Sequence, residues 1–424
     1  MSRAGAASSA LALVLSLPLA ALAADDLDAL KKSLTDKRPA ARARAARDLG
    51  KRGRDVDEDA VKALCPLLKD KDKSVRLAAA TALEMLATTA KRDFVEAAVE
   101  PLLDAVGGEG DAATRKKTLA ALAALLGPKH AAHAEKLYPL LDNKDEETAR
   151  AAADALAHLG GEPADRAVTA LKKLLSSKDP GVQARAVASL ARASDAAESA
   201  EAIAKTLSAS KDNNVRRACC VALVRYSGDS GKPAIAALVE AMKPGAKTDK
   251  ASEEVRVLAA EAIVLIGPPA SQSAAKAIRD TLINDKNQQL RHRCISAGFV
   301  VEDLQKAELV EPLTAVMQET GEAKRMMRYD AARVLAFGLK DKAPDKAVEL
   351  LLQMLADDKL KLTNPSEGGP ADVRFAAATA LGWLGKKVKD DKKVIDALRK
   401  AAKEKDPALK KEAQKALKDL GAGG

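Results

Sequence analysis

The sequence has very few aromatic residues: one Trp, three Tyr and four Phe, or 2% of 424 residues. Yet 47% of the residues are hydrophobic, and Ala and Leu dominate among them. Aromatic side chains normally fill the centre of a globular core or of a β-sheet, so their scarcity argues against both. A core of small side chains instead favours helices that stack closely in thin layers.

Motifs that carry chemistry are also lacking. The chain has no Gly-rich phosphate-binding loop, no nucleophile elbow and no zinc-protease helix. Acid pairs such as Asp357-Asp358 suit solvated turns better than catalytic dyads, which need burial to shift their pKa values. We therefore predict no catalytic, cofactor-binding or metal-binding residues and expect that the chain is not an enzyme.

The longest apolar run lies at the start of the chain. Arg3 precedes the apolar run from Ala10 to Leu17, and Ala21-Leu22-Ala23 has the small-x-small pattern of a cleavage site. Residues 1–23 are therefore expected to be a secretory signal peptide cleaved near Ala23. No later segment approaches 18 uninterrupted apolar residues, so we expect no transmembrane segment in the mature chain and a periplasmic or secreted location.

The net charge is +10, from 70 basic and 60 acidic residues that are interleaved along the chain. This mixture is typical of a solvated surface. A nucleic-acid partner is not expected, because stacking aromatics are missing and an exported protein rarely meets nucleic acid.

A repeated pattern covers the mature chain. Each copy has a turn acid, then Val-Arg, then paired Ala, and a Leu seven residues after the Arg; the clearest copy starts at Asp372-Val373-Arg374 and reaches Leu381. The repeated position is occupied by Leu49, Leu83, Leu122, Leu156, Leu190, Leu223, Ile263, Leu335, Leu381 and Leu417, and once by Gly298. This predicts about eleven units.

The pattern resembles the HEAT repeat family, in the short Ala-rich form typified by the HEAT-like repeats of phycobilin lyases. The resemblance implies an all-α fold, an α-solenoid of about eleven two-helix HEAT repeats. It also implies that the repeated Arg bonds acidic or carbonyl groups of the neighbouring turn and forms a structural ladder. The ladder positions are Arg42, Arg76, Arg115, Arg216, Arg256, Arg291, Arg328 and Arg374, whereas Ala149 and Gln183 stand where an Arg is expected.

Helical geometry supports the same fold independently. At 100° per residue, the Val before the Arg, the Ala residues and the Leu of each copy fall on one helix face, which predicts the buried side of each second helix. The acid precedes this helix, where it can cap exposed N–H groups. An apolar segment before each copy, such as Ala164 to Leu175, predicts the first helix.

The repeats are expected to fill residues 24–424, with insertions near 107–113, 244–252 and 357–371. All three lie in the turn between the first and second helix of a unit. Insertions on one rim of a solenoid are often binding loops, although disordered insertion is equally compatible with the sequence.

The cysteines and histidines of the chain are few. Cys219, Cys220 and Cys294 replace small residues of the pattern, so we expect free, buried thiols instead of disulfides. His130 and His133 share a helix face without further ligands, which favours a solvated surface pair over a metal site.

Positions one, five and eight after the Arg point away from the core and should line the inner surface of the solenoid. In the middle and later units these positions become apolar, which suggests a groove for a partner. The apolar positions are Val221, Val224, Val257, Val264, Phe299, Tyr329 and Phe375, with Arg217, His292 and Arg333 beside them and Trp383 at one end. The alternative is that these residues are buried between adjacent helices.

The expected function is that of a non-enzymatic scaffold that binds an unidentified protein or peptide on this inner surface. Two alternatives remain open. The Lys- and Arg-rich surface could bind anionic envelope polymers or headgroups, and the chain could be an accessory subunit of an enzyme.

Overall fold

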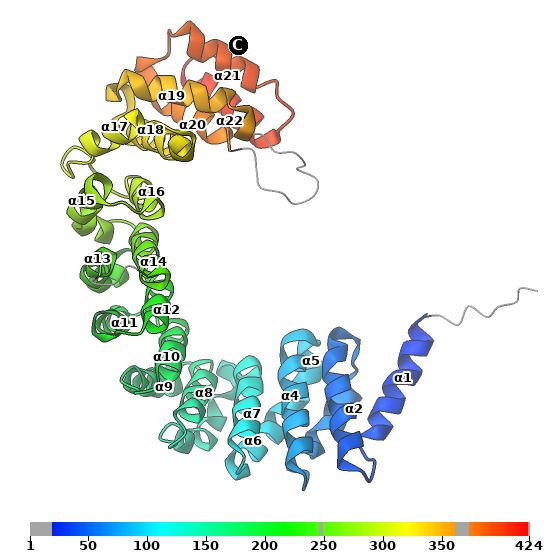
Figure 1. Ribbon diagram of the computed structural model, residues 1–424. Helices are drawn as coiled ribbons and strands as arrows, with labels where there is room; N and C mark the ends of the chain where they lie inside the picture. Colours follow the sequence, from blue (N-terminus) through cyan, green and yellow to red (C-terminus); the bar gives the residue numbers. More distant parts are fainter. Residues whose placement is uncertain (1–18, 246–248, 361–372, 423–424) are drawn as a thin grey trace, which may run out of the picture. The chain divides into compact units, whose positions relative to one another are not determined.

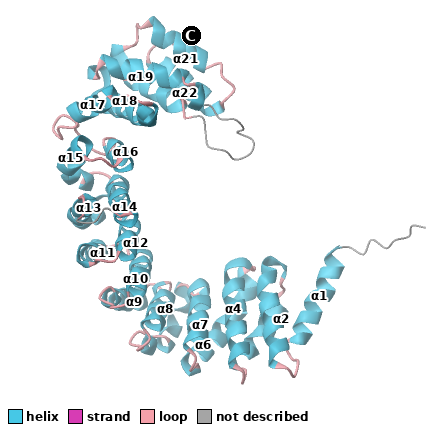
Figure 2. Ribbon diagram, viewed as in Figure 1, coloured by secondary structure: helices cyan, strands magenta, loops and turns pink. Residues whose placement is uncertain are grey.

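The computed structural model describes residues 19–245, 249–360 and 373–422 and shows 22 α-helices there, with no strand in these ranges (Figure 2). Most of the expected signal peptide, most of the 357–371 insertion and part of the 244–252 insertion lie outside the described residues. Helix α1 (Leu19–Ser33) runs across Ala23. The chain divides into two compact units, residues 1–177 and 178–424.

The first unit stacks helix pairs in two layers. The second helices, α2, α4, α7 and α8, pack against one another in chain order, and each is preceded by one or more first helices or 3₁₀ turns. The bounds of the second helices are Pro39–Arg52 (α2), Lys73–Thr89 (α4), Ala112–Leu125 (α7) and Glu146–Ala157 (α8). The first-helix bounds are Leu19–Ser33 (α1), Glu58–Leu64 (α3), Arg92–Val95 (α5), Val99–Gly108 (α6) and Gly161–Leu174 (α9), with a 3₁₀ segment over Pro128–Lys136.

The second unit has the same construction. In Figure 1 its first helices α11, α13 and α15 form one row, and α10, α12, α14 and α16 form the other. The bounds of the second helices are Pro180–Ala193 (α10), Asn213–Leu223 (α12), Lys250–Ile266 (α14), Gln288–Ala297 (α16), Arg325–Leu339 (α18), Phe375–Trp383 (α20) and Pro407–Asp419 (α22). The first-helix bounds are Ala197–Ala209 (α11), Ile235–Met242 (α13), Ala275–Asn284 (α15), Val310–Gln318 (α17), Asp345–Ala356 (α19) and Lys392–Ala401 (α21).

Counted along the described chain, four repeats precede α9 and six follow α10, and α9 and α10 are the two helices between them in the sequence, one in each compact unit. The predicted all-α solenoid of about eleven two-helix repeats is therefore confirmed. Leu49, Leu122 and Leu223 are completely buried, as the repeat pattern predicted. At the 107–113 insertion α6 extends to Gly108, so only residues 109–111 form the turn before α7.

An Asp caps six of the described second helices, as expected, namely α4, α7, α10, α12, α14 and α22, whereas Asn287 caps α16. The carboxylate of Asp72 accepts a hydrogen bond from the Ser74 N–H at 2.8 Å, and Asp212 and Asp406 cap α12 and α22 in the same way. Each cap satisfies N–H groups that the first helical turn leaves without partners, and its charge suits the positive end of the helix. The pKa of Asp72 is lowered, chiefly by its hydrogen bonds with the side chain and backbone of Ser74.

The repeated arginines join neighbouring repeats. Arg76 donates from Nε to Glu109 at 2.7 Å, and Glu109 immediately follows the first helix of the next repeat. The same guanidinium donates from Nη1 to the Asp70 carbonyl at 2.9 Å, so it also satisfies a carbonyl of its own inter-helix turn. One side chain thus bonds two successive turns.

The other ladder arginines vary around this pattern. Arg42, Arg256, Arg291 and Arg374 contact acids of the next repeat, namely Asp70, Asp285, Glu319 and Glu404. Arg115 and Arg328 donate to carbonyls of their own turns, and Arg216 makes no such bond among the described residues. The pKa of Asp70 and that of Glu319 are both lowered, in each case chiefly by the hydrogen bond from the ladder Arg. The ladder holds neighbouring repeats in register where the Ala-rich core offers few large side chains.

Candidate functional site

The predicted inner-surface residues differ in exposure. Val221 on α12 is 57% exposed, whereas five others are half-buried on or just after the second helices of the second unit. These five are Val224, Val257, Val264, Phe299 and Phe375. Tyr329 is only 5% exposed, and its hydroxyl lies 3.3 Å from a carboxylate oxygen of Asp357. Tyr329 therefore packs between repeats and is not part of an open surface.

Three aromatic side chains lie together at one edge of this layer. The ring centroids of Phe337 and Trp383 are 5.2 Å apart, those of Phe299 and Phe337 are 5.6 Å apart, and those of Phe299 and Trp383 are 6.4 Å apart. We call Phe299, Phe337 and Trp383 the aromatic cluster. Their tilted and edge-on arrangements are those that aromatic rings prefer.

The helix ends explain why these residues meet. Phe299 lies two residues after the end of α16, Phe337 lies in the last turn of α18, and Trp383 is the last residue of α20. Since the second helices stack in parallel, the ends of three successive copies fall on the same edge. Phe337 is 42% exposed, and Phe299 and Trp383 are half-buried, so the cluster presents aromatic surface to solvent.

A charged network borders the cluster. The Arg333 guanidinium lies 5.5 Å from the ring centroid of Phe299, and its Nη1 donates to Asp330 at 2.6 Å. The other carboxylate oxygen of Asp330 is 2.6 Å from Nε2 of His292, and the Asp330 side chain is only 13% exposed. Asp330 thus holds Arg333 against the ring, while Arg217, the third predicted cation, pairs with Glu254 at 3.0 Å. This arrangement combines apolar surface with a fixed cation, which suits recognition.

Phe337 is the residue that the sequence reasoning missed. It lies nine residues after Arg328, and Trp383 lies nine after Arg374. Position nine points 180° from the Arg, at the margin of the predicted inner face, so it was not counted among the inner positions. The shared position of Phe337 and Trp383 in the repeat was the available signal.

The histidines that were considered as metal ligands make structural contacts. The prediction of a solvated histidine pair is wrong for His130, which is 6% exposed. Its Nδ1 accepts from the Gly127 N–H at 3.1 Å, and its Nε2 lies 2.7 Å from Glu96, so the ring caps a 3₁₀ segment. In the described part of the chain no group of three or more His, Cys, Asp or Glu could hold a metal ion.

The four cysteines are unpaired thiols. Cys219, Cys220 and Cys294 are buried, and Cys65 is half-buried. Burial raises the pKa of Cys65 to about 11 and that of Cys294 to about 12. Such thiols are protonated at neutral pH and act as small core residues.

Comparison of the sequence with protein families supports the predicted repeats. Residues 27–123 and 167–247 match HEAT repeats, and residues 148–177 match the PBS lyase HEAT-like repeat. No curated protein is detectably similar to the chain in sequence. Within the described ranges, no helix has the length and apolar character needed to cross a membrane.

Solved structures share the fold at low identity. Importin beta is 14% identical with a TM-score of 0.65, over 95% of this chain and 60% of that chain. Kap121p bound to Pho4p is 13% identical with a TM-score of 0.58, over 95% of this chain and 50% of that chain. The chain therefore spans only part of the length of these proteins, and the likeness concerns the fold alone.

Proposed function

Because the chain contains HEAT repeats and has the α-solenoid fold, we propose that it is a non-enzymatic scaffold that binds a protein or peptide partner. The partner contacts the second-helix layer of residues 178–424, with the aromatic cluster as its anchor. HEAT solenoids typically bind proteins, and one structure with this fold, Kap121p, is bound to Pho4p.

The observation that carries this proposal is the position of the aromatic side chains. Three of the eight aromatic residues gather at one exposed edge. In the first unit, the position nine residues after the ladder position holds Lys51, Met85, Ala124 and His158. Clustered exposed aromatics beside a fixed Arg are typical of interface hot spots, which are enriched in Trp, Tyr and Arg.

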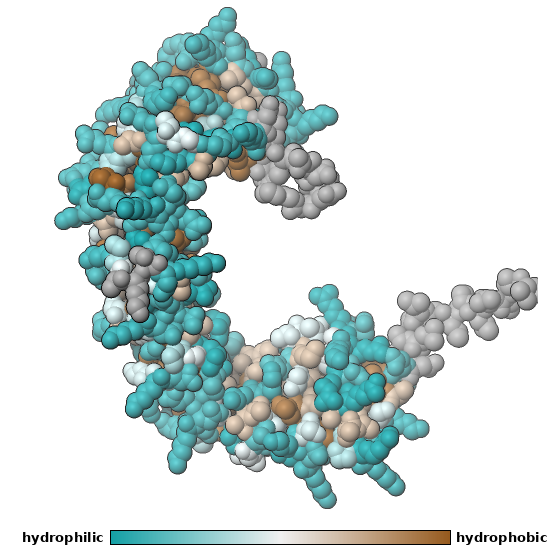
Figure 3. All heavy atoms as spheres, in the orientation of Figure 1, coloured by the Kyte–Doolittle hydropathy of each residue, from teal (hydrophilic) through white to brown (hydrophobic). Residues whose placement is uncertain are grey.

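The basic surface gives less support to an anionic polymer as the ligand. Many of its lysines pair with acids, as Lys117 does with Glu84 at 2.8 Å and Lys136 does with Glu100 and Asp104. Figure 3 shows a largely hydrophilic face with small hydrophobic patches. Such pairs mix both signs of charge on the surface, which does not favour a polyanion.

We further propose that the scaffold works outside the cytoplasm, in a periplasm or after secretion. Arg3, the apolar run from Ala10 to Leu17 and the Ala21-Leu22-Ala23 pattern support this. N-terminal sequencing of protein recovered from the exported fraction tests it, because an intact Met1 would contradict cleavage near Ala23.

Replacement of Phe337 by Ser is expected to reduce partner capture about 30-fold, because loss of a hot-spot aromatic costs about 2 kcal/mol of binding energy. The measurement is crosslinking in cells followed by quantitative mass spectrometry of the adducts. Folding should be unchanged by circular dichroism, since the ring is 42% exposed.

Met85→Ser provides the matched control. Met85 lies at the same repeat position in the first unit and is 38% exposed, so its replacement removes similar apolar surface away from the cluster. Partner capture should be unaffected. Equal adduct yields for Phe337→Ser and the wild-type protein would refute the cluster as the anchor.

A further inference from the structure

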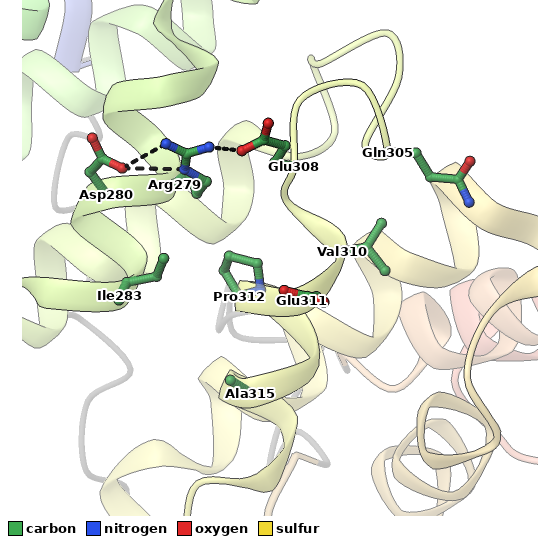
Figure 4. A pocket seen from close by; sticks show the side chains of 9 residues that line it. All are labelled: Arg279, Asp280, Ile283, Gln305, Glu308, Val310, Glu311, Pro312 and Ala315. Atoms are coloured by element: carbon green, nitrogen blue, oxygen red, sulfur yellow. Dashed lines mark hydrogen bonds and ion pairs between the residues drawn. The ribbon is translucent and has the colours of Figure 1, made fainter.

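A groove lies between two first helices of the second unit, in the layer opposite the aromatic cluster. It runs between α15 and α17 and encloses about 820 Å³ (Figure 4). Its apolar lining consists of Ile283 from α15 and Val310, Pro312 and Ala315 from α17. Ile283 is 59% exposed, the highest value among the large hydrophobic residues of the described chain.

Acidic side chains border this apolar lining. Asp280, Glu308 and Glu311 line the groove together with one cation, Arg279, so the lining carries three negative charges and one positive charge, a net of two negative charges. Arg279 is held between Asp280, at 3.2 Å, and Glu308. Glu311 is exposed and has no ion-pair partner among the described residues. The groove is therefore locally acidic on a chain whose net charge is +10.

Glu308 is held in a conformation that normally favours glycine. Its φ is 56°, in the left-handed region. The Leu309 N–H donates to the Leu304 carbonyl and the Glu308 N–H to the Gln305 carbonyl, both at 2.9 Å, which is the Schellman pattern that ends a helical turn. A residue with a side chain costs about 1 kcal/mol more than Gly at such a position. The turn thus keeps a carboxylate on the rim where Gly would be the more stable choice.

We propose that this groove binds a cationic amphipathic helix of another protein. The apolar face of such a helix would cover Ile283, Val310 and Pro312, and its flanking Lys or Arg side chains would pair with Glu311 and the outer oxygens of Asp280. Charge complementarity selects this partner over an anionic or purely apolar one. Since the aromatic cluster lies on the other layer, the solenoid would hold two partners at once.

The test uses a labelled, roughly 14-residue peptide of Leu and Lys in an amphipathic helical pattern, with fluorescence anisotropy as the measurement. Glu311→Lys and Ile283→Ser in the full chain should each weaken the Kd of this peptide about tenfold, or about 1.4 kcal/mol. Glu349→Lys makes the same charge change on the exposed surface of α19, outside the groove, and should change the Kd less than twofold.

A second variant separates binding from folding. Glu308→Gly removes the side chain from a left-handed position, so the urea midpoint of this variant should equal or exceed that of the wild-type protein. It should nevertheless bind the peptide more weakly, because the groove loses one negative charge and Arg279 keeps only Asp280 as a partner. Unchanged binding in Glu311→Lys and Ile283→Ser would overturn the proposal. Equal binding of a Leu–Glu peptide of the same pattern would do so too.

Peptide binding in the groove can be tested independently of the aromatic cluster. Phe337→Ser should leave peptide binding unchanged, because Phe337 lies in the second-helix layer. Failure of the groove would leave the aromatic cluster untouched, and failure of the cluster would leave the groove untouched.

Discussion

Replacement of Gly298 by Leu, the residue found at this position in most other repeats, is expected to destabilise the protein by about 2 to 3 kcal/mol. Restoring a consensus residue normally stabilises a repeat protein. Here the space is already filled, because a Cβ atom on Gly298 would lie 2.4 Å from Cγ1 of Val334 on α18. Gly298 has φ −61° and ψ −22°, so glycine is required for its size and not for its backbone conformation.

Urea denaturation followed by circular dichroism measures this effect. Ile263→Leu is the control, because Ile263 is completely buried at the same position of the preceding repeat and the change conserves volume. It should cost less than about 1.5 kcal/mol. Val334→Ala should reduce the penalty of Gly298→Ala in a double-mutant cycle. A Gly298→Leu protein as stable as the wild type would show that Val334 does not occupy this space.

Replacement of Arg291 by Met should cost about 2 to 3 kcal/mol of stability at neutral pH, near the lower end of the effect of breaking a buried pair. The Arg291 side chain is 10% exposed and that of Glu319 is 19% exposed. The Arg also donates to the Leu282 carbonyl at 3.0 Å, which would lose its partner. Lys324, 2.9 Å from Glu319, retains part of the charge compensation. Arg293→Met is the control, since Arg293 is 49% exposed on the same helix and its loss should cost less than about 1 kcal/mol.

The effect of Arg291→Met on stability should depend on pH because of Glu319. Its pKa is lowered in the folded protein, chiefly by the hydrogen bond from Arg291 and against the opposing effect of burial. A lowered folded pKa contributes stability above the unfolded value of about 4.3, and this contribution is lost as the pH falls through the folded pKa. The stability difference between wild type and Arg291→Met should therefore be largest above about pH 5 and narrow below pH 4. A difference that stays constant with pH would contradict this role of the ion pair.

The fold could be predicted from the sequence because its determinants are local and repeated. The Leu and Ala positions fix the buried face, and an Asp caps six of the second helices, so residues such as Leu122 and Asp212 could be placed without a structure. The resemblance to HEAT repeats gave the positions of the ladder arginines but not those of their acidic partners. These acids, such as Glu109 and Glu319, follow first helices of different length and could not be aligned by spacing alone.

The candidate site was predicted less completely, because exposure depends on neighbouring repeats. Tyr329 was assigned to the inner surface, but Asp357 from the next repeat binds its hydroxyl and the ring is buried. Phe337 was missed because its position, nine residues after Arg328, lies at the margin of the predicted inner face. Helical angles predict which face of its own helix a residue occupies. Whether that residue is buried depends also on the side chains of the neighbouring helix.

The interrupted ladder has a consequence for the cooperativity of unfolding. Ala149 and Gln183 stand where a ladder Arg is expected, and Arg115 and Arg328 donate to carbonyls of their own turns, whereas Arg256 and Arg291 each bond an acid of the next repeat. In a repeat protein, unfolding spreads from copy to copy through nearest-neighbour coupling and stops where that coupling is weak. The repeats that Arg256 and Arg291 join should therefore open together, which native-state hydrogen exchange would register as one shared level of protection across α14, α16 and α18.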